Sequence, residues 1–174
     1  MVPKIRDAEQ DDAAACLDIY RPYVLHTPVT FETDPPTVAD MARRIEAATR
    51  SYAWLIAEVD GRAIGYAYAG PFAVRPAYRW SCEVSVYLEM GRRRTGAGRS
   101  LYGALLPRLI DRGYRVAVAK TAVPNDAAVG LHTAMGFQPV GVHRRIGWKN
   151  GAWHDVAISQ LDLRADDEPP DDPH

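Results

Sequence analysis

Hydrophobic and polar positions alternate with a period of two in several stretches of the chain, which predicts β-strands. The clearest case is a pair of apolar runs, Ala53 to Val59 and Ala63 to Ala69, with Asp60-Gly61 between them. An Asp-Gly pair between two such runs is typical of a tight hairpin turn. The same alternation from Trp80 to Leu88 predicts a third strand with one buried face.

Helical spacing of apolar residues predicts two helices in the N-terminal part of the chain. Asp7 and Gln10 form a capping pair ahead of the first helix, and Pro22 and Pro28 bound this region. Thr37 is the predicted cap of the second helix.

The remaining elements predict one domain, residues 1–164. They are a first strand from Val2 to Arg6, a helix from the turn near Gly98 to Gly113, a strand over Val116 to Lys120, a short helix from Asn125 to Gly136, and a strand pair, Gln138 to Ile146 with His154 to Leu161. This order predicts an α+β (mixed α/β) domain with a central, mostly antiparallel, twisted sheet flanked by helices. Pro107 lies inside one predicted helix, and the sequence offers no reason for it.

Charge is unevenly distributed along the 174 residues, although 21 basic and 22 acidic side chains nearly cancel. Residues 165–174 hold five acids, three prolines and no Lys or Arg, so we expect a disordered acidic tail behind a mildly basic body. Near-neutral net charge argues against a nucleic-acid partner. The four arginines at positions 92, 93, 94 and 99 instead suggest a focused anion site.

Cysteine content and hydropathy restrict the location of the protein. Cys16 and Cys82 are too few for a disulfide framework or a zinc site, so we expect buried free thiols and no metal. The charged N-terminus does not fit a signal peptide, and no apolar run approaches the roughly 20 residues that span a bilayer. We therefore expect a cytoplasmic protein with no membrane partner.

The segment from Val84 to Tyr102 predicts a phosphate-binding turn. A strand enters a glycine-rich turn that opens a helix, whose free N–H groups and partial positive charge suit an anion. Arg94 and Arg99 add full charges, although glycine turns are also common for purely structural reasons. A Walker A loop does not fit, because Ala97 and Gly98 occupy its Lys and Ser/Thr positions.

Two motifs resemble those of the GNAT acetyltransferase superfamily. Arg93 to Gly98 matches its R/Q-x-x-G-x-G/A acetyl-CoA loop, and Asn125 to Phe137 matches the motif that follows. Within the superfamily, the chain resembles the phosphinothricin N-acetyltransferase branch from Ile5 to Leu163. The segments Thr27 to Phe31 and Gly147 to Val156 carry much of that likeness.

The resemblance implies a GNAT-like fold that transfers acetyl from acetyl-CoA to an amine. In such folds the strand ending at Leu88 splays from its neighbour and exposes backbone to the pantetheine arm, while the loop amides hold the pyrophosphate. The residues implied for the cofactor are Val86, Tyr87, Leu88, Arg93, Arg94, Thr95, Gly96, Ala97, Gly98, Arg99 and Asn125.

Two side chains are implied for proton transfer. Glu83 is our candidate general base, because a carboxylate beside the splay can take the proton of an ammonium group. The alternative is a solvated residue on an open strand face. His132 stands where many superfamily members have a tyrosine, and we expect an acid/base or substrate-orienting role. The alternative there is a hydrogen-bonded core histidine.

The expected acceptor is the α-amine of a small amino-acid-like molecule, either phosphinothricin or methionine sulfoximine or sulfone. Phe31, Arg75 and Tyr78 match the branch as acceptor-binding residues, with a surface arginine and two core aromatics as the alternative. Ala73 and Arg79 depart from the branch pattern, which leaves another small amine as the acceptor, or an inactive acetyl-CoA-binding protein, open. Relatives of this branch are commonly homodimers, and we expect one here.

Overall fold

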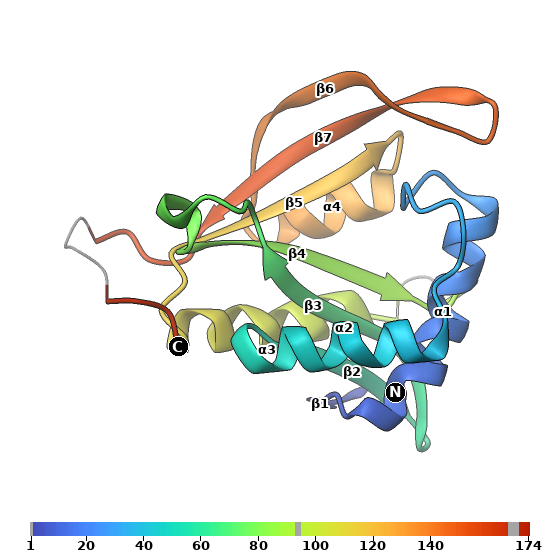
Figure 1. The fold of residues 1–174 in the computed structure, drawn as a ribbon, viewed down its shortest axis with the longest axis horizontal. Coiled ribbons are helices and arrows are strands. Elements are labelled where there is room, and N and C mark those ends of the chain that lie inside the picture. Colours follow the sequence, from blue (N-terminus) through green and yellow to red (C-terminus); the bar gives the residue numbers. More distant parts are fainter. Residues whose placement is uncertain (1, 93–94, 167–170) are drawn as a thin grey trace.

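Seven strands form one sheet in the order β1-β2-β3-β4-β5-β7-β6 (Figure 1). The computed structural model describes residues 2–92, 95–166 and 171–174. The strands are β1 (Lys4–Asp7), β2 (Trp54–Val59), β3 (Arg62–Pro71), β4 (Ser81–Leu88), β5 (Val116–Val123), β6 (Gln138–Lys149) and β7 (Ala152–Asp162). All neighbours are antiparallel except β4 and β5, so the predicted mostly antiparallel sheet is confirmed.

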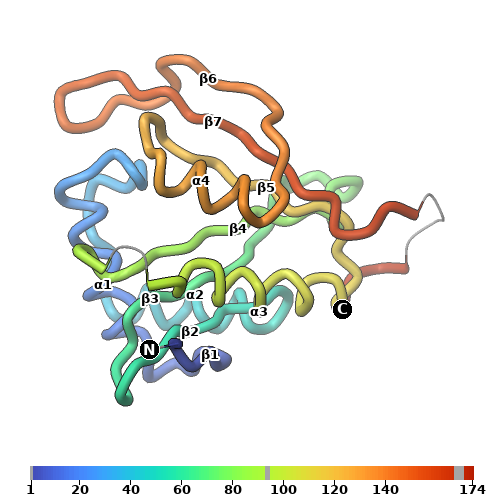
Figure 2. The backbone as a smooth tube through the Cα atoms, turned by 180° about the vertical axis from the view of Figure 1, so that it is seen from behind, coloured from blue at the N-terminus to red at the C-terminus, as the bar shows by residue number. Residues whose placement is uncertain are grey.

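Helices cover both faces of this sheet. They are α1 (Ala13–His26), α2 (Val38–Ser51), α3 (Ala97–Asp111) and α4 (Asp126–Ala134), with short 3-10 turns η1 (Gln10–Asp12) and η2 (Pro76–Tyr78). One buried cluster joins α1 and α2 to one face of the sheet, and a second joins α3 to the other face. Figure 2 shows the backbone from the side opposite to that of Figure 1. β2 serves both clusters, because Ile56 enters the first and Leu55 the second.

The β2–β3 hairpin forms where the Asp-Gly pair predicts it. Asp60 has φ 50° and Gly61 has φ 75°, the left-handed backbone that a two-residue hairpin turn of this kind requires. Thr37 caps α2 as predicted, since its side chain accepts from the N–H of Asp40. Cys16 and Cys82 are buried free thiols, as expected.

The start of the first helix differs from the prediction. Glu9 and Asp12 form the capping box of η1, instead of Asp7 and Gln10. The reason is Arg6, whose guanidinium donates to both carboxylate oxygens of Asp12 at 2.7 and 2.8 Å and fixes that side chain. Pro22 lies inside α1 rather than at its boundary.

The structure gives a reason for the proline inside α3. Pro107 has no N–H to donate to the carbonyl of Gly103, one turn earlier. Both residues lie on the exposed side of the helix, where water can solvate that carbonyl. Leu101, Leu105 and Leu109 are fully buried on the opposite side and hold the helix to the sheet.

The C-terminal tail contacts arginines at one end of the sheet. Asp172 pairs with Arg79 at 2.7 Å, and the backbone carbonyl of Asp171 accepts from the indole N–H of Trp80 at 2.9 Å. The predicted disorder of residues 165–174 stays a prediction.

Candidate active site

β4 and β5 separate in the middle of the sheet. Their parallel ladder joins Ser81 to Val116 and ends where Glu83 meets Val118. Beyond that point β4 follows β3 to Leu88, while β5 follows β7, and the two strands diverge (Figure 1). This is the splay that the family resemblance implies. The backbone edge of β4 that faces the gap has no partner strand, so it is available to a ligand up to the carbonyl of Leu88, which accepts from the hydroxyl of Tyr23 at 2.6 Å.

A cavity fills the gap between the diverging strands. It is lined by Val29, Val84, Ser85, Val86, Tyr87, Tyr102, Lys120, Thr121, Ala122, Asn125, Ala128 and His132. Strand alternation assigns these side chains to two faces. Val84 and Val86 pack on the α3 side, whereas Tyr87 packs among the α1 and α2 residues. The cavity therefore reaches through the sheet and opens toward both helical layers.

The N-terminus of α3 lies after the predicted phosphate-binding turn. Gly96 has φ 74° and forms the N-cap, and α3 begins at Ala97. Gly98 meets α4 closely, because an added Cβ would lie 2.9 Å from Cδ2 of Leu131. Thr95 and Arg99 are exposed in the turn and first helical residues. These positions present a helix start with its partial positive charge, as an anion site requires.

The arginines before α3 do not all remain available for a ligand. Glu89 binds Arg62 at 2.6 Å and Arg92 at 2.5 Å, and these two partners lower the pKa of Glu89 to about 2. Arg92 therefore has an anionic partner within the protein. Arg93 and Arg94, the next two candidates, lie outside the described residues.

Glu83 does not line the cavity, but Lys120 does, and the two form an ion pair. Oε2 of Glu83 lies 2.7 Å from Nζ of Lys120, with the side chains 31% and 41% exposed. Alternation along β4 and β5 places both on the α1 side of the sheet. The Phe72 ring centroid lies 5.8 Å from the same Nζ. Glu83 is thus a partly exposed carboxylate at the base of the splay.

His132 is nearly buried on the opposite side of the gap, at 7% exposure. Its Nε2 lies 3.0 Å from the hydroxyl of Tyr102, and its Nδ1 lies 3.4 Å from the hydroxyl of Thr121. Burial lowers the pKa of His132, which favours the neutral imidazole. The ring also lies 5.3 Å from that of Phe137, between centroids. A neutral, hydrogen-bonded histidine consequently faces the cavity.

The three predicted acceptor-binding residues lie on two separate loops. Tyr78 packs edge-on against Phe72 at 5.5 Å between centroids, which connects it to Lys120. Arg75 is exposed at the N-cap of η2. Phe31 lies elsewhere, against Gly147 of β6 and 6.3 Å from the ring of His154.

A buried lysine fixes the loop that carries Phe31. Lys149 ends β6 at only 5% exposure, and its Nζ donates to the carbonyl of Thr30 at 2.7 Å. The hydroxyl of Thr30 lies 2.6 Å from that of Tyr20 in α1. The loop after α1 is thus attached to the β6–β7 hairpin on one side and to α1 on the other.

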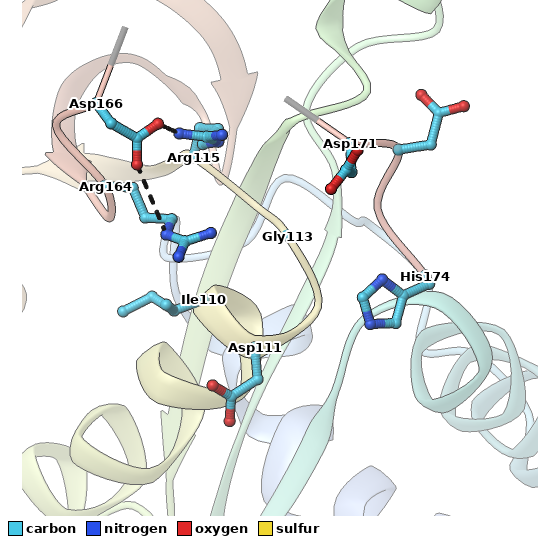
Figure 3. Close-up of a pocket in the computed structure, with 9 residues that line it drawn as sticks. Ile110, Asp111, Gly113, Arg115, Arg164, Asp166, Asp171 and His174 are labelled. Atoms are coloured by element: carbon cyan, nitrogen blue, oxygen red, sulfur yellow. Dashed lines mark hydrogen bonds and ion pairs between the residues drawn. The ribbon is translucent and has the colours of Figure 1, made fainter. Parts of the chain in front are cut away.

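A second, polar cavity lies at the other end of β4 and β5, beside the tail (Figure 3). Asp166 pairs there with Arg115 and, at 3.9 Å, with Arg164. The lining of this cavity is mainly acidic, with four aspartates against Arg115 and Arg164, which does not suit an anionic ligand, and the strands beside it are paired. Within the described ranges, no group of three or more His, Cys, Asp or Glu side chains could hold a metal ion. The gap between β4 and β5 is therefore the better candidate.

Comparison with known proteins identifies the family. An acetyltransferase (GNAT) domain family matches residues 5–158. The chain belongs to the GNAT acetyltransferase family. The predicted family, fold and class of enzyme are thereby confirmed, and with them acetyl-CoA as the acetyl donor of this class.

Two curated proteins and one solved structure are similar to this GNAT acetyltransferase over most of its length. A phosphinothricin N-acetyltransferase of Streptomyces viridochromogenes is 40% identical, covering 92% of this chain and 87% of the relative. An L-methionine sulfoximine/L-methionine sulfone acetyltransferase of Pseudomonas paraeruginosa is 33% identical, with 94% and 96% covered. The Sinorhizobium meliloti phosphinothricin acetyltransferase, solved with acetyl-CoA, superposes with a TM-score of 0.90 at 36% identity, with 94% and 89% covered.

The cavity of this acetyltransferase contains some predicted site residues and some that sequence reasoning missed. Val86, Tyr87, Asn125 and His132 line it, and their roles stay predictions. Lys120 was missed, although a charged residue inside a mostly apolar strand was a usable signal.

Among the described residues, no helix is both long and apolar enough to cross a membrane.

Proposed function

We propose that this acetyltransferase moves acetyl from acetyl-CoA to the α-amine of a small amino-acid-like acceptor, phosphinothricin or methionine sulfoximine or sulfone. The observation that carries the proposal is the cavity in the splay, with Lys120 and its partner Glu83 on one side and His132 on the other. The printed functions of the relatives support this class of acceptor.

We assign the α3 side of the gap to acetyl-CoA. From Val86 to Leu88, β4 pairs with β3 on one edge only, and its other edge suits the amide groups of the pantetheine arm. The carbonyl of Leu88 already accepts from the hydroxyl of Tyr23 at 2.6 Å. For the pyrophosphate we propose the turn and first helical residues, which are Arg93, Arg94, Thr95, Gly96, Ala97, Gly98 and Arg99. Asn125 caps α4 by accepting from the N–H of Ala128 at 3.1 Å, which leaves its NH₂ group to donate to the cofactor.

The chemistry needs a neutral amine at the thioester that acetyl-CoA supplies. We assign to Glu83 the removal of one ammonium proton, since its carboxylate is partly exposed beside the gap. The amine nitrogen then bonds to the acetyl carbon, the carbon–sulfur bond breaks, and the sulfur takes the second proton. We assign to His132 an orienting role at the departing sulfur, because it lines the cavity on the α3 side and its two ring nitrogens already face the hydroxyls of Tyr102 and Thr121.

The acceptor would lie on the α1 side, where Glu83 and Lys120 are. We propose Tyr78 and Phe31 as its walls and Arg75 as a cation for a second acidic group on its side chain. Tyr78 is connected to this place through Phe72. Phe31 belongs to the same loop as Val29, which lines the cavity.

A thiol-release assay with acetyl-CoA and a panel of amino acids tests the enzyme proposal. Phosphinothricin, methionine sulfoximine and methionine sulfone should release CoA, and Glu83→Gln should lower kcat about 100-fold or more while acetyl-CoA still binds. If every acceptor is inert, the inactive acetyl-CoA-binding alternative replaces the proposal. If Glu83→Gln keeps full turnover, another group is the base.

We propose that the protein is a homodimer formed through the β6–β7 hairpin. Trp148 and Trp153 form a cross-strand pair with ring centroids 5.3 Å apart, and they are 59% and 51% exposed. Ile146, Val140 and Val142 are also exposed on β6. Apolar side chains gathered on one exposed element favour an interface.

Sedimentation velocity tests this assembly. The wild type should sediment as a dimer, and Trp148→Ser with Trp153→Ser should shift it to the monomer. The matched control is Val74→Ser, at an exposed apolar residue on another loop. A wild-type monomer at all concentrations contradicts the proposal.

We also propose a cytoplasmic location, where acetyl-CoA is available and the free thiols stay reduced.

A further inference from the structure

Lys120 is the unexpected residue of the cavity. β5 reads Val-Ala-Val-Ala-Lys-Thr-Ala-Val, so a charged side chain interrupts an apolar strand. Among the described residues that line the cavity, Lys120 is the only lysine or arginine. Placing a charge in a half-buried strand costs free energy, so this lysine needs a reason.

Its partner in the structure is the carboxylate of Glu83, 2.7 Å away. The two side chains are 41% and 31% exposed, so a small molecule in the cavity can reach both. The pair is a negative and a positive charge fixed on neighbouring strands at the point where the ladder ends. An α-amino acid carries the complementary pair, an ammonium and a carboxylate on one carbon atom.

We infer that Lys120 binds the α-carboxylate of the acceptor while Glu83 receives its ammonium group. The inference rests on the proposed function. In this arrangement each charge of the acceptor meets an opposite charge of the protein, and the ammonium is directed to the proposed base. Lys120 is thereby a specificity-determining residue, which selects amino acids over amines that lack the carboxylate.

Other cations that the structure describes are less suited to this role. Lys149 is buried and occupied by the carbonyl of Thr30. Lys4 lies on β1, the far edge strand of the sheet. Arg99 belongs to the first turn of α3, which covers the opposite face. Arg75 remains free to bind a second acidic group, so the two cations have separate tasks.

The test compares acids with their amides. L-Phosphinothricin and L-methionine sulfone are assayed beside the α-carboxamide of each, in which the carboxylate charge is removed and the amine kept. The wild type should prefer the acid. In Lys120→Met the ratio of kcat/KM for acid over amide should fall at least about tenfold, mainly through KM of the acid.

Two variants serve as controls, and a third can replace the test variant. Lys120→Arg keeps the charge and should keep most of the preference, whereas Lys4→Met removes a lysine elsewhere and should change nothing. Acetyl-CoA binding, measured by calorimetry, should stay within about twofold in all of them. Lys120→Gln replaces Lys120→Met if the latter does not fold.

Each outcome decides the matter. A Lys120→Met or Lys120→Gln enzyme that keeps the wild-type preference overturns the inference and leaves the proposed function intact. Equal losses for acid and amide, through kcat alone, also overturn it, since Lys120 would then act only through Glu83. A wild type that acetylates neither acid overturns the proposed function and the inference together.

Discussion

The hydroxyl of Tyr102 in α3 lies 3.0 Å from Nε2 of His132 in α4, and both side chains line the cavity. The ring of Phe137 lies 6.0 Å from that of Tyr102 and 5.3 Å from that of His132, between centroids. The orientation of the imidazole is therefore fixed by residues from two helices and the segment that follows them. A side chain that helps a leaving group needs such fixed geometry.

Tyr102→Phe should lower kcat about tenfold, because the imidazole loses one of its two hydroxyl partners and its orientation. The free energy of unfolding should fall by about 1–2 kcal/mol, since a buried polar nitrogen is left without that partner. Steady-state kinetics and urea unfolding measure the two effects.

The control for this variant is Tyr114→Phe. The Tyr114 hydroxyl donates to the carbonyl of Ser51 at 2.9 Å, outside the cavity. The Tyr114→Phe variant should lose a similar amount of stability, and its kcat should be unchanged. Equal kinetic effects in the two variants would show that only stability is involved.

Acid should destabilise the protein through His132. Burial lowers its pKa in the folded state, while in the unfolded chain the pKa is about 6.5. The unfolded chain thus binds more protons between these two values. Above pH 6.5 the contribution of His132 to the free energy of unfolding is fully present. Below pH 6.5 the free energy of unfolding falls, by at most about 1.4 kcal/mol per pH unit from this residue. Urea unfolding at pH 5, 6 and 7 should show a shallower fall in His132→Gln. An unchanged slope contradicts the assignment.

Gly65→Ala should destabilise the end of β4. A Cβ at position 65 would lie 2.9 Å from the carbonyl oxygen of Tyr87 and 2.5 Å from a side-chain carbon of Leu88. Backbone atoms cannot move aside cheaply, so the free energy of unfolding should fall by about 1–3 kcal/mol. Gly70→Ala on the same strand has no atom within 4 Å and is the matched control. Thermal unfolding that ranks the two the other way would refute this prediction.

Gly147→Ala should move Phe31 without unfolding the protein. A Cβ there would lie 2.2 Å from Cε2 of Phe31, whose ring is partly exposed and can rotate away. If Phe31 walls the acceptor site, KM for the acceptor rises about tenfold at nearly constant kcat. Gly141→Ala, also on β6, has open space at the new Cβ and should behave as wild type. If Gly147→Ala has the same KM as the wild type, Phe31 is not part of the acceptor site.

Local chemistry explains why parts of the fold could be predicted from the sequence. Asp60 and Gly61 define a hairpin by their backbone preferences alone, and Thr37 caps α2 through a residue three positions away. The start of α1 could not be predicted in this way, because two acid-containing pairs have capping spacing. Arg6 on β1 decides between them by binding Asp12.

The site follows the same division between local and distant contacts. The glycine turn before α3 and the cap at Asn125 are local, so their motifs are visible in the chain. The pairing of Glu83 with Lys120 depends on the register of two parallel strands with a helix between them. Alternation along β5 indicates only on which face of the sheet the side chain of Lys120 lies. Its partner becomes known when the strands are aligned.

The contact of Lys149 with Thr30 also bears on the order in which the site can be made. The two residues are 119 positions apart, and β7, which completes the pairing of β5, follows Lys149 in the chain. During synthesis the helices α1 and α2 and strands β1 to β4 can therefore assemble while the wall of the cavity near Val29 still lacks its anchor. The acceptor side of the site would be the last part to form. A chain cut short before its final hairpin could keep much of its sheet and still have no acceptor site.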